Sequence, residues 1–255
     1  MNIANQIIQL NEPAPVSMAD SWFEYSTPDH FWVHHRNIVL DRHFKKIIRG
    51  ADQIGEVGCG NGLVLHHLNQ AYQKAADGFE LNLNALNLCP KLPGDLYIYN
   101  ILQRHPKLTD RYQVLLMMDV LEHIENETEF LEAVRDHLKP GGHLIIGVPM
   151  RQHLYSDYDS VAGHYRRYST RHLKSVVQAS GFVVKEVVQW GHVYIPLVMV
   201  RKIMLKNVSG EEAIQKGFAT SPIMNQMLSL LRHLDFVIPT LGATGTSAFL
   251  LAQKR

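Results

Sequence analysis

Short apolar runs of strand length alternate with amphipathic stretches of helix length between residues 50 and 190. This alternation is typical of α/β proteins, in which helices cover a parallel sheet. The run 112–120 is almost continuously apolar, as expected of a strand that is buried on both of its faces. The sequence therefore predicts an α/β fold with a mostly parallel sheet.

Capping and turn signals divide this region into individual elements. Asn126, with Glu129 three residues later, is typical of a helix start, and the Lys-Pro-Gly-Gly run 139–142 predicts the end of that helix. Ser169 can cap a further helix that closes at Gly181. The expected strands are 53–57, 75–81, 95–101, 112–120, 143–149, 182–190 and 246–255, and the expected helices are 63–73, 126–138 and 169–180.

Two regions fall outside this alternation. Residues 1–49 hold aromatic and charged residues, and we expect an N-terminal helical cap there. Residues 191–244 hold two apolar helix-like stretches joined by a polar linker, and they lie between the last two expected strands. They are therefore expected to form a helical insertion into a core domain made of residues 50–190 and 245–255.

Composition excludes several classes of protein. A net charge of +1 gives no indication of a nucleic-acid-binding surface. The two cysteines, Cys59 and Cys89, do not make a disulfide framework, which is typical of a reducing compartment. The run 192–200 is broken by Pro196 and is too short to span a membrane. These features, with no signal peptide evident, predict a cytoplasmic protein without a transmembrane segment.

The chain holds 15 histidines, so metal binding has to be considered. The adjacent pairs His34-His35 and His66-His67 are poor candidates, because neighbours on a helix diverge and do not converge on one ion. Neither an HExxH nor a CxxC pattern occurs. The expectation from the sequence is that there is no metal site.

A glycine-rich loop follows the first expected strand of the core domain. Gly58, Gly60 and Gly62 give the spacing G-x-G-x-G, and Leu63 stands where the third glycine of a dinucleotide-binding loop is expected. Glu56 precedes the loop; its charge would disfavour a pyrophosphate and suits an ammonium group. The loop alone is equally compatible with a tight strand–helix turn.

Polar residues also stand at the ends of the next three expected strands. Glu80 could accept hydrogen bonds from both hydroxyls of a ribose, and the amide of Asn100 could face an adenine. Asp119 lies at the end of the following strand. The carboxyl ends of parallel strands meet at one edge of a sheet, where α/β proteins bind ligands, so these residues together predict a nucleoside pocket.

Together with several neighbouring runs, the glycine loop and the polar strand ends resemble the class I S-adenosylmethionine-dependent methyltransferases. The resemblance rests on EVGCGNG, Glu80, YNI, LLMMDVLEHI and LKPGGHLIIGVP, in this order and spacing. It implies a Rossmann-like three-layer sandwich whose seven-stranded sheet has its last strand antiparallel between the fifth and sixth. The run 246–255 fits that last strand.

The resemblance also implies a binding site for S-adenosylmethionine. Asn100 departs from the family, which usually has Asp there. Arg36 could bind the cofactor carboxylate, although pairing with Glu24 or Asp29 is an equal alternative. The residues expected to bind the cofactor are Glu56, Gly58, Cys59, Gly60, Glu80, Asn100, Ile101, Asp119, Val120 and Arg36.

Two further segments resemble a bacterial subgroup of this family. HFWVHHRN is similar to its HFWF-x-x-R segment, and 156–169 is similar to its GHxRRY loop. The loop 150–169 is expected to border the methyl acceptor; a hydrated loop whose arginines pair with local acids is the alternative. Candidate acceptor-binding residues are Tyr155, His164, Tyr165, Arg166 and Arg167, with His164 the candidate base and His123 a second candidate or a packed residue.

The sequence thus predicts an enzyme that moves a methyl group from S-adenosylmethionine to a small-molecule or lipid-linked acceptor, with an anionic acceptor one option. A non-catalytic, regulatory S-adenosylmethionine-binding protein is an alternative. An NAD-dependent oxidoreductase is disfavoured by the glycine spacing and by Glu56. The insertion 191–244 is interpreted as a lid, a homodimer interface or a membrane contact.

Overall fold

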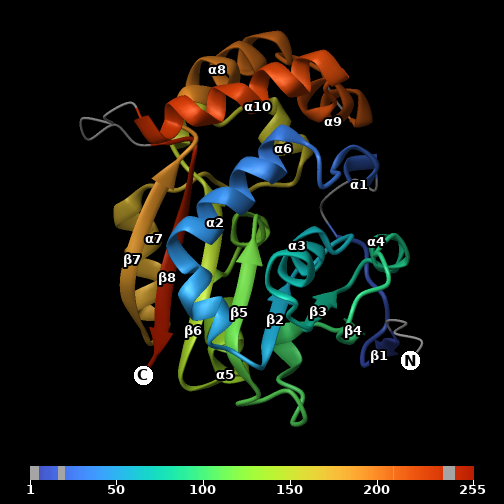
Figure 1. Cartoon of the computed structure of the whole chain (residues 1–255), viewed down its shortest axis with the longest axis vertical. Helices are drawn as coiled ribbons and strands as arrows, with labels where there is room; N and C mark the ends of the chain where they lie inside the picture. The colour runs from blue at the N-terminus through green and yellow to red at the C-terminus, as the bar shows by residue number, and fades with distance from the viewer. Residues whose placement is uncertain (1–5, 17–20, 209, 238–244) are drawn as a thin grey trace.

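The computed structural model describes residues 6–16, 21–208, 210–237 and 245–255, without the side chains of residues 21, 24, 211 and 237. An eight-stranded sheet lies between two layers of helices, and three further helices sit above the carboxyl edge of its parallel strands (Figure 1). The strands are β1 (Ile7–Gln9), β2 (Ile54–Val57), β3 (Ala76–Glu80), β4 (Leu96–Ile98), β5 (Tyr112–Met118), β6 (Leu138–Pro149), β7 (Phe182–Trp190) and β8 (Ser247–Lys254).

The strand order is β1-β4-β3-β2-β5-β6-β8-β7. Strands β1 to β6 pair in parallel, whereas β8 runs antiparallel to both β6 and β7. The expected antiparallel insertion of the last strand is therefore confirmed. The prediction of seven strands was one short, because β1 joins the sheet beside β4 from a region expected to be helical. Three residues with partly exposed side chains give too short a pattern to indicate a strand.

Both faces of the sheet are buried along its central strands, as the apolar runs predicted. The helices are α1 (Ser21–Tyr25), α2 (Phe31–Arg49), α3 (Leu63–Tyr72), α4 (Leu83–Asn87), α5 (Glu127–His137), α6 (Asp157–Val161), α7 (Thr170–Ala179), α8 (Ile195–Met204), α9 (Glu211–Phe218) and α10 (Pro222–Val237). Alternate residues of β5 face opposite cores: Leu115 packs with side chains of α5 and α7, and Leu116 packs with those of α2 and α3.

Side-chain caps place several of these helices where the sequence predicted them. The Asn126 side chain accepts a hydrogen bond from the Glu129 amide at the start of α5. The Ser169 hydroxyl does the same for the His172 amide at the start of α7. The turn expected at 139–142 lies inside the long strand β6, which begins directly where α5 ends.

The region 191–244 contributes α8, α9 and α10. Two helices were expected there, and α9 lies in the segment expected to be a polar linker. The Asn225 side chain accepts a hydrogen bond from the Phe31 amide at 2.7 Å, and the Asp235 carboxylate accepts one from the Gly191 amide at 2.6 Å. The insertion is thus tied to the start of α2 and to the end of β7. Within the described ranges, no helix combines the length and the apolar character needed to cross a membrane.

His30 links α2 to α9 in a way that requires its neutral form. Its Nδ1 accepts from the Trp32 amide and caps α2, while its Nε2 donates to the Phe218 carbonyl at 3.0 Å. The imidazole also stacks on the Phe218 ring, with centroids 4.1 Å apart. Burial lowers the pKa of His30 to about 4. Protonation at Nδ1 would remove the acceptor that caps the helix.

We therefore expect acid to destabilise the fold through His30. Between the unfolded pKa of 6.5 and the folded value near 4, the unfolded chain binds the extra proton, so the free energy of unfolding falls as the pH falls. At pH 5 the loss from this group is about 2 kcal/mol. Denaturant unfolding at pH 7.5 and pH 5 checks this, with His30→Asn as the comparison because Asn also caps helices but does not titrate. An equal loss in both proteins would contradict it.

Candidate active site

A cavity of about 330 Å³ lies at the carboxyl ends of β2, β3 and β5. The glycine loop after β2 forms one wall, and Glu80, Asn100 and Asp119 border the cavity from the ends of three further strands. These are the strand ends that were expected to meet at one edge of the sheet. All ten residues predicted to bind the cofactor line this cavity: Arg36, Glu56, Gly58, Cys59, Gly60, Glu80, Asn100, Ile101, Asp119 and Val120.

The glycine loop needs glycine because of close approach as well as backbone conformation. Gly58 has φ +69°, and a Cβ there would lie 2.5 Å from a methyl carbon of Val120. Gly60 has φ +52°, and a Cβ there would lie 2.9 Å from the ring of Phe23. Side chains at these positions would strain the backbone and enter occupied space, so the loop can stay close to the cavity only with glycine.

Glu80 is held rigidly by backbone amides. Its Oε1 accepts from the amides of Leu81 at 2.8 Å and Asn82 at 3.0 Å, and its Oε2 accepts from the Gly60 amide at 3.0 Å. The last bond joins the ribose-binding candidate directly to the glycine loop. A carboxylate has about four acceptor sites and these bonds use three, so Oε2 can still accept a hydroxyl donor from a ligand.

Asn100 uses its side chain locally. Its Oδ1 accepts from the Leu102 amide and starts the short helix η1 (Ile101–Gln103), while its own amide donates to the Asn11 side chain at 2.8 Å. The segment after β1 therefore supports the expected adenine side of the cavity. The sequence gave no signal for this contact, because it depends on an edge strand that was not predicted.

Arg36 connects two acids of the cavity. Its Nη1 donates to Oδ2 of Asp119 at 3.1 Å, so the observed partner is neither of the two acids proposed from the sequence, Glu24 and Asp29. The Glu24 side chain lies outside the described residues. Asp119 has φ +55°, an uncommon conformation for a residue with a side chain.

Glu56 is the second acid near Arg36. It is buried, and no described residue forms a hydrogen bond with its Oε2. Burial raises the pKa of Glu56, and the charge of Arg36 opposes that rise. A ligand ammonium would supply the missing partner of Glu56, and Arg36 has further N–H groups for a ligand carboxylate. The pair thus fits the amino-acid end of S-adenosylmethionine.

A second cavity, of about 650 Å³, meets the first at Trp22 and Asp119, which line both. Its walls come from α6, the insertion helices and the start of α2. Most of its lining is apolar. Representative side chains are Phe31, Tyr158, Leu197, Met204, Phe218 and Leu228.

His164 and Arg167 enter this second cavity and share one buried acid. Asp159 accepts from His164 Nδ1 at 3.0 Å and from Arg167 Nε at 2.8 Å. Burial alone would raise the pKa of Asp159, but the hydrogen bonds and charges of His164 and Arg167 hold that pKa well below its usual range. The guanidinium of Arg167 is therefore neutralised within the protein, as the alternative interpretation of this loop expected.

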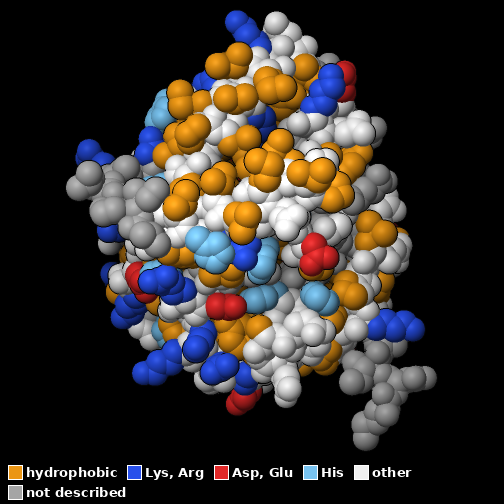
Figure 2. Space-filling view, turned by 45° about the horizontal axis from the view of Figure 1, so that its top comes forward, with side chains coloured by type: hydrophobic (Ala, Val, Ile, Leu, Met, Phe, Trp, Pro, Cys, Tyr) orange, Lys and Arg blue, Asp and Glu red, His pale blue; other side chains and the backbone are white. Residues whose placement is uncertain are grey.

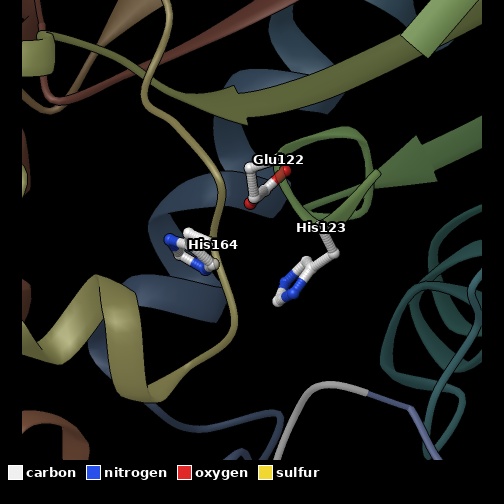
Figure 3. A group of neighbouring side chains, drawn as sticks. All are labelled: Glu122, His123 and His164. Carbon is white, nitrogen blue, oxygen red and sulfur yellow. The ribbon is translucent and has the colours of Figure 1, made fainter. Parts of the chain in front are cut away.

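His123 and Glu122 follow Asp119 on the short helix η2 (Leu121–His123). His123 lines the first cavity, and Glu122 and His164 line the second. Figure 3 shows these three side chains as neighbours. The rings of His123 and His164 meet edge to face, with centroids 4.7 Å apart. Burial, followed by the neighbouring His164, lowers the pKa of His123 to about 3. Burial and the charge of Asp119 raise the pKa of Glu122.

Three other acceptor-binding candidates line neither cavity. Tyr155 donates its hydroxyl to the His164 carbonyl and supports that loop. Arg166 binds the Ile124 carbonyl at 2.7 Å and pairs with Glu127, and Tyr165 is half exposed beside it. Glu122, by contrast, was not singled out from the sequence, although it stands next to His123.

Comparison with known proteins agrees with this geometry. A family model described as a methyltransferase domain matches residues 22–187. The chain belongs to this family. It is also 33% identical over 99 residues to the ubiquinone biosynthesis O-methyltransferase of Rickettsia typhi; the match covers 37% of this chain and 39% of that enzyme. The chain thus matches well under half the length of this curated relative.

Solved structures share the fold. A SAM-dependent methyltransferase from Archaeoglobus fulgidus superposes with a TM-score of 0.55 and 17% identity, over 86% of this chain and 92% of that one. Phosphoethanolamine N-methyltransferase 2 of Haemonchus contortus, in complex with S-adenosylhomocysteine, superposes with a TM-score of 0.54 and 15% identity, over 86% of this chain and 52% of that one. The [4+2]-cyclase SpnF superposes with a TM-score of 0.61 and 15% identity, over 98% of this chain and 86% of that one. The expected class I, Rossmann-like methyltransferase with S-adenosylmethionine as its cofactor is confirmed.

We expect Glu80→Gln to weaken S-adenosylmethionine binding about 10- to 100-fold, because a hydrogen bond to a charged group contributes roughly 1.5–3 kcal/mol. Calorimetric titration of the cofactor measures this. Glu125→Gln is the matched control, since Glu125 is exposed and lines neither cavity. Equal affinities in the two variants would show that Glu80 does not hold the cofactor.

Proposed function

We propose that this methyltransferase transfers a methyl group from S-adenosylmethionine to an oxygen atom of a largely apolar acceptor. The observation that carries the proposal is the second cavity, which is walled by apolar side chains and meets the cofactor cavity at Trp22 and Asp119. An acceptor seated there would lie next to the methyl donor. The O-methyltransferase named among the relatives supports oxygen as the acceptor atom.

Methyl transfer asks little covalent chemistry of the protein. The C–S bond of the sulfonium breaks as the O–C bond forms, and the leaving thioether is neutral, so alignment and exclusion of water are the main requirements. The acceptor hydroxyl also loses a proton. His164 lines the acceptor cavity and His123 lines the cofactor cavity, so both lie close to the proposed position of this hydroxyl. One of them accepts the proton as a base, or the two bind a group that lowers the pKa of the hydroxyl.

The cavity favours an apolar acceptor over an anionic one. Arg167 is paired with Asp159, and Lys216 pairs with Glu212 on its own helix. Arg201 lies over the Tyr158 ring, 4.1 Å from its centroid, and lines the same cavity. It is therefore the group an acceptor anion would contact, and Arg201→Met would raise the acceptor KM only if the acceptor carries such a charge.

The outer face of the insertion suggests how such an acceptor arrives. Exposed apolar side chains gather over α8 and α10 (Figure 2). Val200, Met204 and Met224 belong to this face and also line the second cavity, so the cavity opens toward it. Lys202 and Lys206 stand on the same segment with exposed side chains, and Lys202 also donates to the His153 carbonyl at 2.7 Å. A basic, apolar surface of this kind favours an anionic lipid surface, from which a lipid-linked acceptor can enter.

The activity is tested by incubating the protein with S-adenosylmethionine and a series of phenols with alkyl chains of increasing length. Mass spectrometry should detect products heavier by one methylene unit, with turnover rising with chain length. Glu80→Gln should reduce turnover at low cofactor concentration. If S-adenosylmethionine binds but no phenol, short or long, is methylated, the oxygen-acceptor proposal fails and the regulatory alternative gains support.

Replacing Ile203 and Met227 together by Glu should reduce sedimentation with anionic vesicles at least fivefold below wild type. Both side chains are more than half exposed, so cofactor affinity and thermal stability should not change. Leu88→Glu, at an exposed leucine of the loop after α4, is the control. If wild type instead forms a dimer that the double variant dissociates, and vesicles are not bound, this face is a homodimer interface.

A further inference from the structure

Three side chains that ligate metals meet between the two cavities. Glu122 and His123 come from η2, and His164 comes from the loop after α6 (Figure 3). Each offers one ligand atom, and these atoms all lie within 4.8 Å of one another. Ligands at about 2.1 Å from one ion are roughly 3–4 Å apart, so small side-chain movements would bring the three onto a single metal.

Glu122 has no other evident role in the fold. Its side chain is fully buried, and no described residue gives a hydrogen bond to either of its carboxylate oxygens. Burying a carboxylate without a partner is costly, and the usual compensation is an ion pair or a metal. The charge of the nearby Arg167 offsets only part of this cost, because its Nη2 pairs with Asp159 at 2.7 Å.

His164 is oriented as a metal-binding histidine usually is. Its Nδ1 bonds to the buried Asp159 carboxylate at 3.0 Å, which fixes the ring and leaves Nε2 as the ligand atom. Histidines that bind metals commonly donate their second nitrogen to a carboxylate in this way. Asp159 itself is fixed by two bonds from Arg167, so the whole unit is preformed.

We infer that Glu122, His123 and His164 bind one divalent transition-metal ion. Two imidazoles and one carboxylate suit Zn²⁺, Fe²⁺, Co²⁺ or Ni²⁺ better than Mg²⁺ or Ca²⁺, which prefer oxygen ligands. Three protein ligands leave coordination positions open for an exogenous oxygen. Asp159 is a positioning residue that acts through His164.

The site lies between the two cavities, and its position points to a role for the metal in methyl transfer. This role rests on the proposed function. The acceptor hydroxyl would bind the metal from the second cavity and release its proton to solvent, because a divalent cation stabilises the resulting oxyanion. The oxyanion then attacks the methyl carbon, forming the O–C bond while the C–S bond breaks. His164 then acts as a ligand and does not take up the proton.

Cobalt is the sharpest probe, because Co²⁺ bound by imidazole and carboxylate absorbs visible light. The untagged full chain is treated with a chelator, dialysed and titrated with CoCl₂ alone, following absorbance and heat. We expect one Co²⁺ per chain. Glu122→Gln and His164→Ala should each weaken binding at least 100-fold, and Asp159→Asn about 10- to 100-fold. His153→Ala, at an exposed histidine of the same segment, should match wild type.

Thermal unfolding and S-adenosylmethionine titration show whether each variant is folded. The inference fails if wild type binds Co²⁺ no better than folded Glu122→Gln, or if His153→Ala loses binding as His164→Ala does. Because metal binding is measured without cofactor or acceptor, its failure leaves the proposed methyl transfer standing. Stoichiometric Co²⁺ binding without methylation of any phenol would instead remove the proposed function and keep the site.

Discussion

Parallel pairing of β2 with β3 on one side and with β5 on the other sets the position of the polar groups that line the first cavity. The register Glu56↔Gly78 and Glu56↔Leu116 brings the ends of the three strands to one level. The loops that follow therefore start side by side, and Glu80 can accept a bond from the Gly60 amide of the neighbouring loop. A shift of this register would separate the glycine loop from Glu80 and Arg36 from Asp119 together.

The sequence predicted the parts of the fold that depend on local pattern. Continuous apolar runs located β5 and β6, and Asn126 and Ser169 located helix starts, because these signals act within a few residues. The residues that line the first cavity were predictable because most of them stand at or just after the end of a strand. In contrast, β1 and α9 are stabilised by contacts with distant segments, such as the pairing of Ile7 with Leu96 and the stacking of Phe218 on His30.

The acceptor side was less predictable for the same reason. A dense polar loop indicates function but not which side chains face inward. Arg166 and Arg167 are neighbours in sequence, yet the first pairs with Glu127 outside both cavities and the second pairs with Asp159 inside one. The cluster that contains Glu122 forms because His164 approaches it from a separate loop, and spacing along the chain does not reveal this contact. The adjacent histidine pairs first considered are not part of the cluster.

The position of β8 has a consequence for the order in which the chain folds. Within the part of the chain that the structure describes, β7 pairs with β8 alone, and the insertion separates the two strands in sequence. Strand β7 and its helix α7 cannot join the sheet until β8 has docked on β6. This part of the sheet therefore depends on contacts between residues distant in sequence, which form slowly. The insertion therefore lengthens the chain segment that must close before β7 and β8 can pair. We expect the length of this insertion to affect the rate of folding more than the stability of the folded protein, because the cost of closing a loop rises only slowly with its length.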